Sequence, residues 1–219
     1  MEHAHSQKNS DDQENCHLCG NLLPGSGRPW QVWCSGCMAE ALAGWPRALH
    51  FAGVVGLLHL TFFGFTGVGA MGLLLVWVLV LLSLIDINTR LLPDDIVLPL
   101  LWAGLVLNAF GGLTSLTSAV LGAAAGYLSL WGLYWAGRLA TGEEPLGYGD
   151  FKLTAALGAW LGLPAVAVVL LSAAMLHTGW RVVSAMRGRA ASDAPFGPFL
   201  AAGGFIALMA RALRPALLA

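Results

Sequence analysis

The sequence predicts an all-α protein, a polytopic bundle of membrane-spanning helices. Of its 219 residues, 57% are hydrophobic and only 11% are charged, whereas soluble domains carry about 25% charged residues. Aspartate, glutamate, lysine and arginine are absent from four long stretches, residues 48–85, 96–137, 153–180 and 194–210. The net charge of −1 and the lack of a basic patch give no indication of a nucleic-acid partner. The expected environment is therefore the lipid bilayer.

The uncharged stretches divide into about seven spans. A helix needs about 20 residues to cross a bilayer, so the first two stretches are each long enough for two helices. The third stretch is expected to turn at Leu163-Pro164. The helix before this turn is long enough to cross the bilayer only if it begins near Gly147, ahead of the uncharged stretch. The predicted helices lie near 49–67, 70–88, 95–111 and 117–138, on either side of the turn at 162–165, and at about 196–213. Residues 48–219 are thus expected to form one membrane domain.

The first 47 residues differ from the rest. Residues 1–15 are polar and are predicted to be disordered. The N-terminal region has no apolar signal sequence, so we expect the N-terminus to stay in the cytoplasm. The connectors at 86–95, 138–152 and 181–193 then face the cytoplasm as well, and they carry the basic residues that the positive-inside rule places there. These residues are Arg90, Arg138, Lys152, Arg181, Arg187 and Arg189.

Four cysteines in residues 16–47 predict a small cytoplasmic metal-binding segment. Cys16, Cys19, Cys34 and Cys37 follow the pattern C-x2-C-x14-C-x2-C, which is close to a zinc-ribbon pair of knuckles. Four thiolates fill a tetrahedral site, so a zinc ion held here is structural. Free thiols in a reducing compartment, or a redox-active pair, are the alternatives.

Two aspartates are expected at membrane depth on the same side of the bilayer. Asp86 follows sixteen uncharged residues at the cytoplasmic end of the second span, and Asp150 stands at the cytoplasmic start of the fifth. An ionisable group in a membrane helix costs roughly 2.5–3.5 kcal/mol and is functional by default. Two neighbouring carboxyl groups in a low-dielectric site do not both ionise readily, so such a pair supplies one acid and one base. The alternative for Asp86 is a solvated helix end.

The residues around the aspartates have alternative roles. Asp94 and Asp95 follow a proline and precede an apolar run, which predicts that they cap a helix. Gly147 and Gly149 allow a backbone to approach closely, so an extended substrate strand could lie beside Asp150. For Lys152, an interaction with Asp150, a contact with a substrate carbonyl, and snorkelling to the interface all remain open.

Three motifs resemble one family. The segments DINTRLLPDDIVLPLLWAGLVLN at 86–108, GYGDFKLTAALGAWLG at 147–162 and PFGPFLAAGG at 195–204 resemble the bacterial prepilin peptidases, also called type IV leader peptidases. That family has one motif aspartate before Leu-Pro-Asp and another in Gly-x-Gly-Asp, and both are catalytic. The resemblance implies that Asp86 and Asp150 are the catalytic pair of a cytoplasm-facing intramembrane aspartic endopeptidase. The implied substrates are type IV prepilins or type II secretion pseudopilins, cut after a short basic leader between Gly and Phe.

The resemblance also bears on a second activity. Bifunctional members methylate the new N-terminus with S-adenosylmethionine, and many begin with a membrane helix and a Gly-Ser-Phe-Leu-Asn-like stretch before paired cysteines. This sequence has the cysteines without that preceding part, so the resemblance leaves the methyltransferase activity open. A non-catalytic pilin-binding assembly factor and a proton-coupled transporter are the alternatives to the peptidase. The sequence predicts no oligomeric state.

Overall fold

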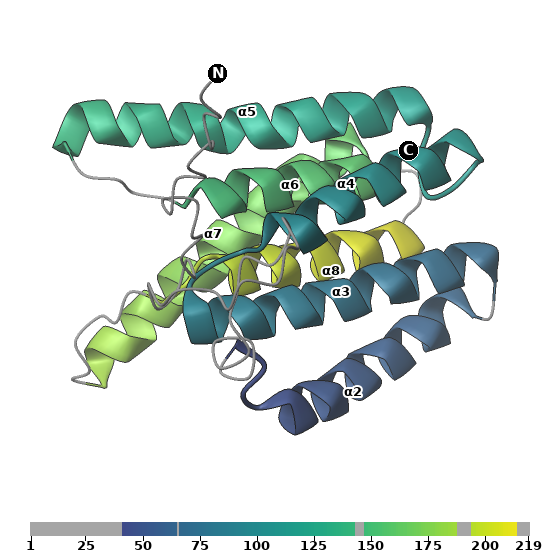
Figure 1. Cartoon of the computed structure of the whole chain (residues 1–219), viewed down its shortest axis with the longest axis horizontal. Helices are drawn as coiled ribbons and strands as arrows, with labels where there is room; N and C mark the ends of the chain where they lie inside the picture. Colours follow the sequence, from purple (N-terminus) through teal and green to yellow (C-terminus); the bar gives the residue numbers. More distant parts are fainter. Residues whose placement is uncertain (1–40, 65, 143–146, 188–193, 214–219) are drawn as a thin grey trace, which may run out of the picture.

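The computed structural model describes residues 41–64, 66–142, 147–187 and 194–213. Within these ranges the chain forms seven α-helices and no β-strand, which confirms the predicted all-α class. Figure 1 shows most of the helices running side by side along the molecule. In chain order they are α2 (Trp45–Phe63), α3 (Gly67–Thr89), α4 (Asp94–Ala109), α5 (Leu116–Thr141), α6 (Tyr148–Leu161), α7 (Leu163–Met186) and α8 (Gly197–Leu213).

The predicted disordered segment 1–15 and the predicted zinc ligands lie outside the described residues. These ligands are Cys16, Cys19, Cys34 and Cys37.

Polar caps and a glycine set several helix ends. The hydroxyl oxygens of Thr66 and Ser115 accept hydrogen bonds of 3.0 and 3.2 Å from the backbone N–H groups of Gly69 and Ser118, at the starts of α3 and α5. Such caps satisfy N–H groups that have no partner within the helix. Only Gly162 separates α6 from α7, and its φ of 86° lies in the left-handed region that glycine tolerates. The turn predicted at 162–165 therefore falls at a single residue.

The chain is a membrane protein. Among the described residues, four helices are long and apolar enough to cross a bilayer: α2, α3, α5 and α7, with 19, 23, 26 and 24 residues. The other three, α4, α6 and α8, have 16, 14 and 17 residues. At about 1.5 Å per residue, α6 is about 21 Å long, shorter than the hydrocarbon core of about 30 Å.

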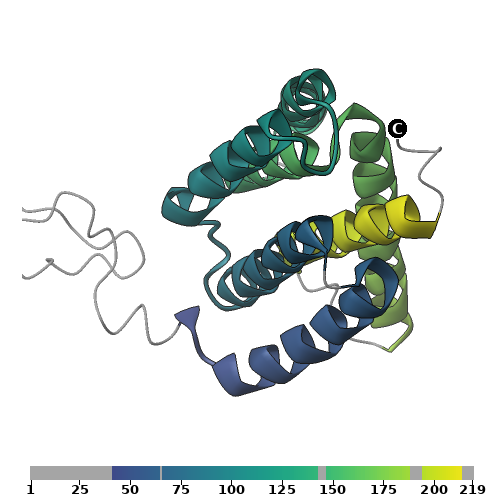
Figure 2. The ribbon, with the colours of Figure 1, turned by 90° about the vertical axis from the view of Figure 1, so that its right-hand side faces the viewer.

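Helix α6 is the buried centre of the bundle. Asp150, Phe151 and all of residues 153–161 are buried. Helices α4, α5, α7 and α8 all contact α6, and Figure 1 shows α6 between α5 and α8. Both views place α2 on the opposite side of the bundle from α5, and Figure 2 shows this from the end. A helix that is buried on every side is usually apolar all round. Asp150, a buried ionisable residue in the first turn of α6, is an exception to this pattern.

Small residues let α5 approach α6 closely. A Cβ atom at Gly122 would lie 2.6 Å from the carbonyl oxygen of Gly158, and one at Gly126 would lie 2.7 Å from that of Thr154. A Cβ atom at Gly158 would collide with the Gly122 backbone. Close packing of this kind joins helices in membranes, where the hydrophobic effect does not hold them together.

Two side chains fasten α4 to α6. The indole N–H of Trp160 donates a 2.7 Å hydrogen bond to the Leu100 carbonyl oxygen. The Asn108 amide nitrogen donates bonds of 2.7 and 3.2 Å to the carbonyl oxygens of Ala159 and Trp160. Each of these groups is buried, and a buried polar group without a partner is costly. The bonds thus fix α4 and α6 in one register, running parallel.

Replacing Gly126 by alanine is expected to destabilise the protein. The new Cβ meets backbone atoms of Thr154 and Ala155, which cannot move without shifting α6. Overpacking of this kind costs about 1–3 kcal/mol. We expect a lower midpoint of thermal unfolding in detergent for the Gly126→Ala variant.

Gly132 on the same helix provides the matched control. It is exposed, and a Cβ there meets nothing within 4 Å. Alanine favours a helix over glycine by up to about 1 kcal/mol, so Gly132→Ala should leave the midpoint unchanged or raise it. Equal effects at the two positions would contradict the close α5–α6 contact.

Candidate active site

Asp86 lies buried at the end of α3 against the start of α8. Its side chain is 4% exposed, and its Oδ2 atom accepts a 3.0 Å hydrogen bond from the backbone N–H of Gly197. A Cβ atom at Gly197 would collide with that carboxylate oxygen, so this close approach requires glycine. The end of α3 is closed by Arg90, whose N–H bonds to the Asp86 carbonyl oxygen and whose φ is 56°.

Asp150 lies buried in the first turn of α6. Its residue is 7% exposed, and Gly147 is the N-cap of the helix. The carboxyl group faces that N-cap, since a Cβ at Gly147 would stand 3.5 Å from its Oδ2 atom. The Thr154 hydroxyl bonds back to the Asp150 carbonyl oxygen at 2.8 Å. The backbone of Asp150 therefore lies in regular helical geometry.

The fold brings the two aspartates together, although they are 64 residues apart in the sequence. Asp86 is bonded to the start of α8, which contacts α6, and Leu92, six residues after Asp86, packs against Gly149, the residue before Asp150. Each carboxyl group also lies at the N-terminus of a helix, α8 for Asp86 and α6 for Asp150. Helix N-termini carry partial positive charge and stabilise anions. Two adjacent buried carboxyl groups can hold one proton between them, and such a pair can activate water.

The two glycines before Asp150 differ in their surroundings. Gly147 is exposed. A Cβ at Gly149 would lie 2.8 Å from Cβ of Leu92, so the space beside Gly149 is already filled. Leu92 belongs to residues 90–93, the short connector between α3 and α4. Gly149 thus lets this connector approach α6, and Gly147 is the more open of the two glycines.

Lys152 contacts Asp94. Its Nζ atom lies 2.8 and 2.6 Å from the two carboxylate oxygens of Asp94. Asp94 was predicted to cap α4, and that prediction is wrong: the N-cap is Pro93, no side chain caps the helix, and Asp94 and Asp95 occupy its first turn. The physical reason is the lysine, which draws the Asp94 carboxylate across to α6.

Aromatic side chains cover the other side of the α6 start. Tyr148 stands between the two motif glycines and is 55% exposed. Its hydroxyl donates a 3.3 Å hydrogen bond to that of buried Tyr134 on α5, which also accepts a 2.7 Å bond from Arg138. The rings of Tyr134, Tyr148 and Phe151 contact one another. This cluster anchors the first turn of α6 to the end of α5.

The chain entering α2 is fastened at the same end of the bundle. The Asn88 amide nitrogen, two residues beyond Asp86, donates 2.9 Å bonds to the carbonyl oxygens of both Ala41 and Ala43. The segment that follows the cysteines is therefore attached next to the aspartates.

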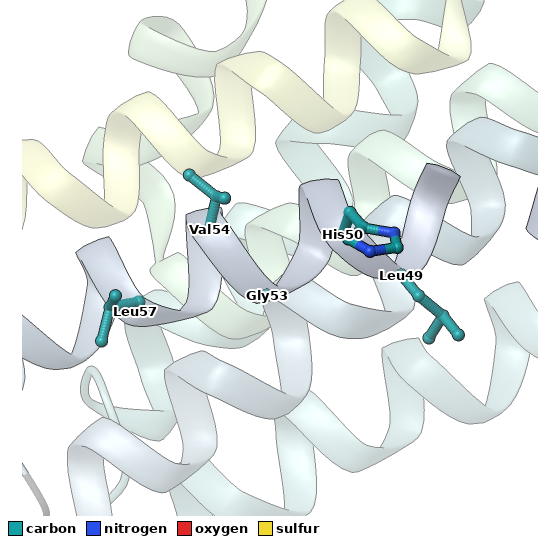
Figure 3. Close-up of a pocket in the computed structure, with 5 residues that line it drawn as sticks. All are labelled: Leu49, His50, Gly53, Val54 and Leu57. Carbon is teal, nitrogen blue, oxygen red and sulfur yellow. The ribbon is translucent and has the colours of Figure 1, made fainter. Parts of the chain in front are cut away.

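A shallow apolar depression on α2 is a separate feature. Figure 3 shows its lining, which comes from one helix face: Leu49, His50, Gly53, Val54 and Leu57. The ring nitrogen Nδ1 of His50 is bonded within the same helix, 2.6 Å from the Pro46 carbonyl oxygen. The depression contains no carboxyl group and lies away from the buried face of α2. It is consistent with a lipid-facing surface.

Sequence reasoning missed two partners in the candidate site. Gly197, which binds the Asp86 carboxylate, lies in the motif PFGPFLAAGG, but no local pattern pairs it with Asp86. Asp94 was assigned to the helix start, and its partner stands 58 positions away. Among the described residues, His, Cys, Asp and Glu side chains form no group of three or more that could hold a metal.

Comparison with known proteins identifies one family. The sequence profile described as the type IV leader peptidase family matches residues 73–182, a range that includes both aspartates. No solved structure matches this chain.

Curated relatives carry the name prepilin leader peptidase/N-methyltransferase. One from Aeromonas hydrophila is 53% identical over 139 residues, covering 63% of this chain and 48% of the relative. One from Aeromonas salmonicida is 47% identical over 182 residues, covering 80% and 61%. One from Pseudomonas aeruginosa is 39% identical over 207 residues, covering 89% and 70%. The chain thus spans about half to three fifths of the length of the two Aeromonas relatives.

Proposed function

The chain belongs to the type IV leader peptidase family, and from this premise we propose that it is a membrane-embedded aspartic endopeptidase that removes the leader from prepilins or pseudopilins. One observation carries the proposal: Asp86 and Asp150, which match the family's catalytic motifs, are both buried at the end of the bundle where α3, α6 and α8 meet. The names of the relatives supply prepilins as the substrate class, and the resemblance of the motifs adds pseudopilins.

In the proposed reaction the two carboxyl groups act as one acid and one base. The ionised aspartate takes a proton from a water molecule, and the resulting hydroxide attacks the carbonyl carbon of the scissile peptide bond. The protonated partner donates its proton to the carbonyl oxygen, which gives a gem-diol. As the gem-diol collapses, the first aspartate passes the proton it took from water to the leaving amine, and the partner takes back a proton from a diol hydroxyl. The Gly197 N–H, bonded to Asp86 Oδ2, orients that carboxyl group through these steps.

The arrangement of the helices supports a site at the edge of the membrane. We propose that α4, α6 and α8 cross together with the four longer helices, which gives seven spans. Helix α6 is only 14 residues long and is enclosed by other helices, and Asp150 lies in its first turn. The basic residues Arg90, Arg138, Lys152 and Arg181 favour the cytoplasm for the end that carries the aspartates.

We also propose that Cys16, Cys19, Cys34 and Cys37 hold a structural zinc ion. The support is their spacing, two C-x2-C pairs. Ala41, bonded to Asn88, follows Cys37 by four residues, a distance of at most about 14 Å even in an extended chain. The metal would therefore be held on the side of the bundle that carries Asp86.

The proposal extends to N-methylation of the new N-terminus, with S-adenosylmethionine as the methyl donor. Its support is the second half of the relatives' printed name. Adding the donor to the cleavage reaction tests it separately, since methylation raises the product mass by one CH2 unit without changing the cut.

Asp86→Asn and Asp150→Asn are each expected to abolish cleavage. An amide neither takes a proton from water nor donates one to the leaving group, and paired catalytic residues fail as a unit. The measurement is mass spectrometry of a prepilin after incubation with purified protein in detergent.

Asp95→Asn is the matched control, because Asp95 is exposed in the first turn of α4. That variant should cut at the wild-type rate. Full cleavage activity in either variant would contradict the catalytic pair. Wild-type protein that cuts no prepilin, together with normal pilus assembly in cells that carry either variant, would favour a non-catalytic assembly factor. Proton uptake into vesicles without cleavage would favour the transporter.

Removing the metal is expected to unfold the cysteine segment without dismantling the helix bundle. Cys34→Ser leaves three thiolates, which weakens a site whose binding energy is folding energy. Elemental analysis should give one zinc per wild-type chain and less in the variant, while the helical circular dichroism stays the same. Wild-type protein that contains no zinc after purification without chelators would contradict the assignment.

A further inference from the structure

Lys152 and Asp94 form an ion pair beside the aspartate pair. The Nζ atom of Lys152 is within 2.8 Å of both carboxylate oxygens of Asp94. Lys152 stands two residues after Asp150 in α6, and Asp94 is the first residue of α4. The side chains are 32% and 51% exposed. The pair thus closes the outer end of the contact between α4 and α6.

The connector at residues 90–93 links this ion pair to the other aspartate. It begins directly after α3, which carries Asp86, and ends at Asp94. Leu92 in its middle packs against Gly149, the residue before Asp150. The connector therefore runs from one catalytic helix across the start of the other.

The helices that carry the two aspartates are otherwise held by different neighbours. Helix α3 packs mainly against α2 and α8, and its contact with α4 is small. Helix α4 is fastened to α6 by Trp160 and Asn108, both away from the aspartates. Near the aspartates, the Leu92 contact and the Lys152–Asp94 pair hold the connector on α6.

We propose that Lys152 and Asp94 are positioning residues that clamp the 90–93 connector onto α6 and thereby set the separation of Asp86 and Asp150. The kinetic part of this inference rests on the peptidase function proposed above. Lys152 affects the reaction indirectly, by holding Asp94 and the connector in place, and it does not need to touch the substrate. An exposed ion pair contributes little to overall stability, so its loss should affect the geometry of the pair more than the folding of the bundle.

Kinetics of charge variants test the clamp. Lys152→Met and Asp94→Asn should each lower kcat by up to about fivefold, the rate equivalent of the upper limit for one exposed ion pair, with KM and the unfolding midpoint nearly unchanged. The double variant should be no slower than either single variant, because both remove the same interaction. The swapped pair, Lys152→Asp with Asp94→Lys, should recover most of the rate, and Asp95→Asn should behave as wild type.

Other kinetic outcomes overturn the clamp. A raised KM with normal kcat in Lys152→Met, and no effect in Asp94→Asn, means that the lysine binds substrate directly. Unchanged kinetics in both variants mean that the pair positions nothing.

Hydrogen–deuterium exchange gives a readout that needs no activity. The backbone amides of residues 90–92 should exchange faster in Lys152→Met and Asp94→Asn than in wild type or Asp95→Asn. Unchanged exchange contradicts the clamp whatever the enzyme does. If exchange rises but wild-type protein cuts no prepilin, the clamp stands and the proposed peptidase function fails.

Discussion

The structure depends on the close burial of α6 between its neighbours. This helix has no exposed face beyond its first turn, and backbone-to-backbone contacts at Gly122, Gly126 and Gly158 fix how far it lies along α5. A shift of α6 along its axis would break these contacts and the bonds from Asn108 and Trp160. Because Asp150 begins the helix, packing in the middle of the bundle determines the depth of a carboxyl group at its end.

Asp86 is positioned by α8, the last of the described helices in chain order. Gly197 is 111 residues from Asp86, yet its N–H holds the Asp86 carboxylate. Both acids therefore lie at helix N-termini, where anions are stabilised, in a region that otherwise disfavours charge. The helix N-termini thus offset part of the free-energy cost of placing two ionisable groups in a membrane protein. It also places them where a peptide strand from the cytoplasm would reach them under the proposed function.

Much of this fold follows from the pattern of charge along the sequence. All seven described helices begin and end inside the uncharged stretches or within about six residues of them, because a charge is expensive in lipid and the turns carry glycine or proline. The partners of the site residues do not follow from such patterns. An acid at a helix start can cap that helix or reach another one, and only the packing of α4 on α6 decided that Asp94 pairs with Lys152. The Gly149–Leu92 contact is tertiary in the same way.

The coupling between Asp86 and Asp150 is the most direct test of this account. A double-mutant cycle would compare the unfolding free energies of wild type, Asp86→Asn, Asp150→Asn and the double variant in detergent. If the carboxyl groups interact, the change in the double variant should differ from the sum of the single changes by roughly 0.5–3 kcal/mol. Additivity within about 0.5 kcal/mol, as found for distant sites, would show that the two acids do not form a pair.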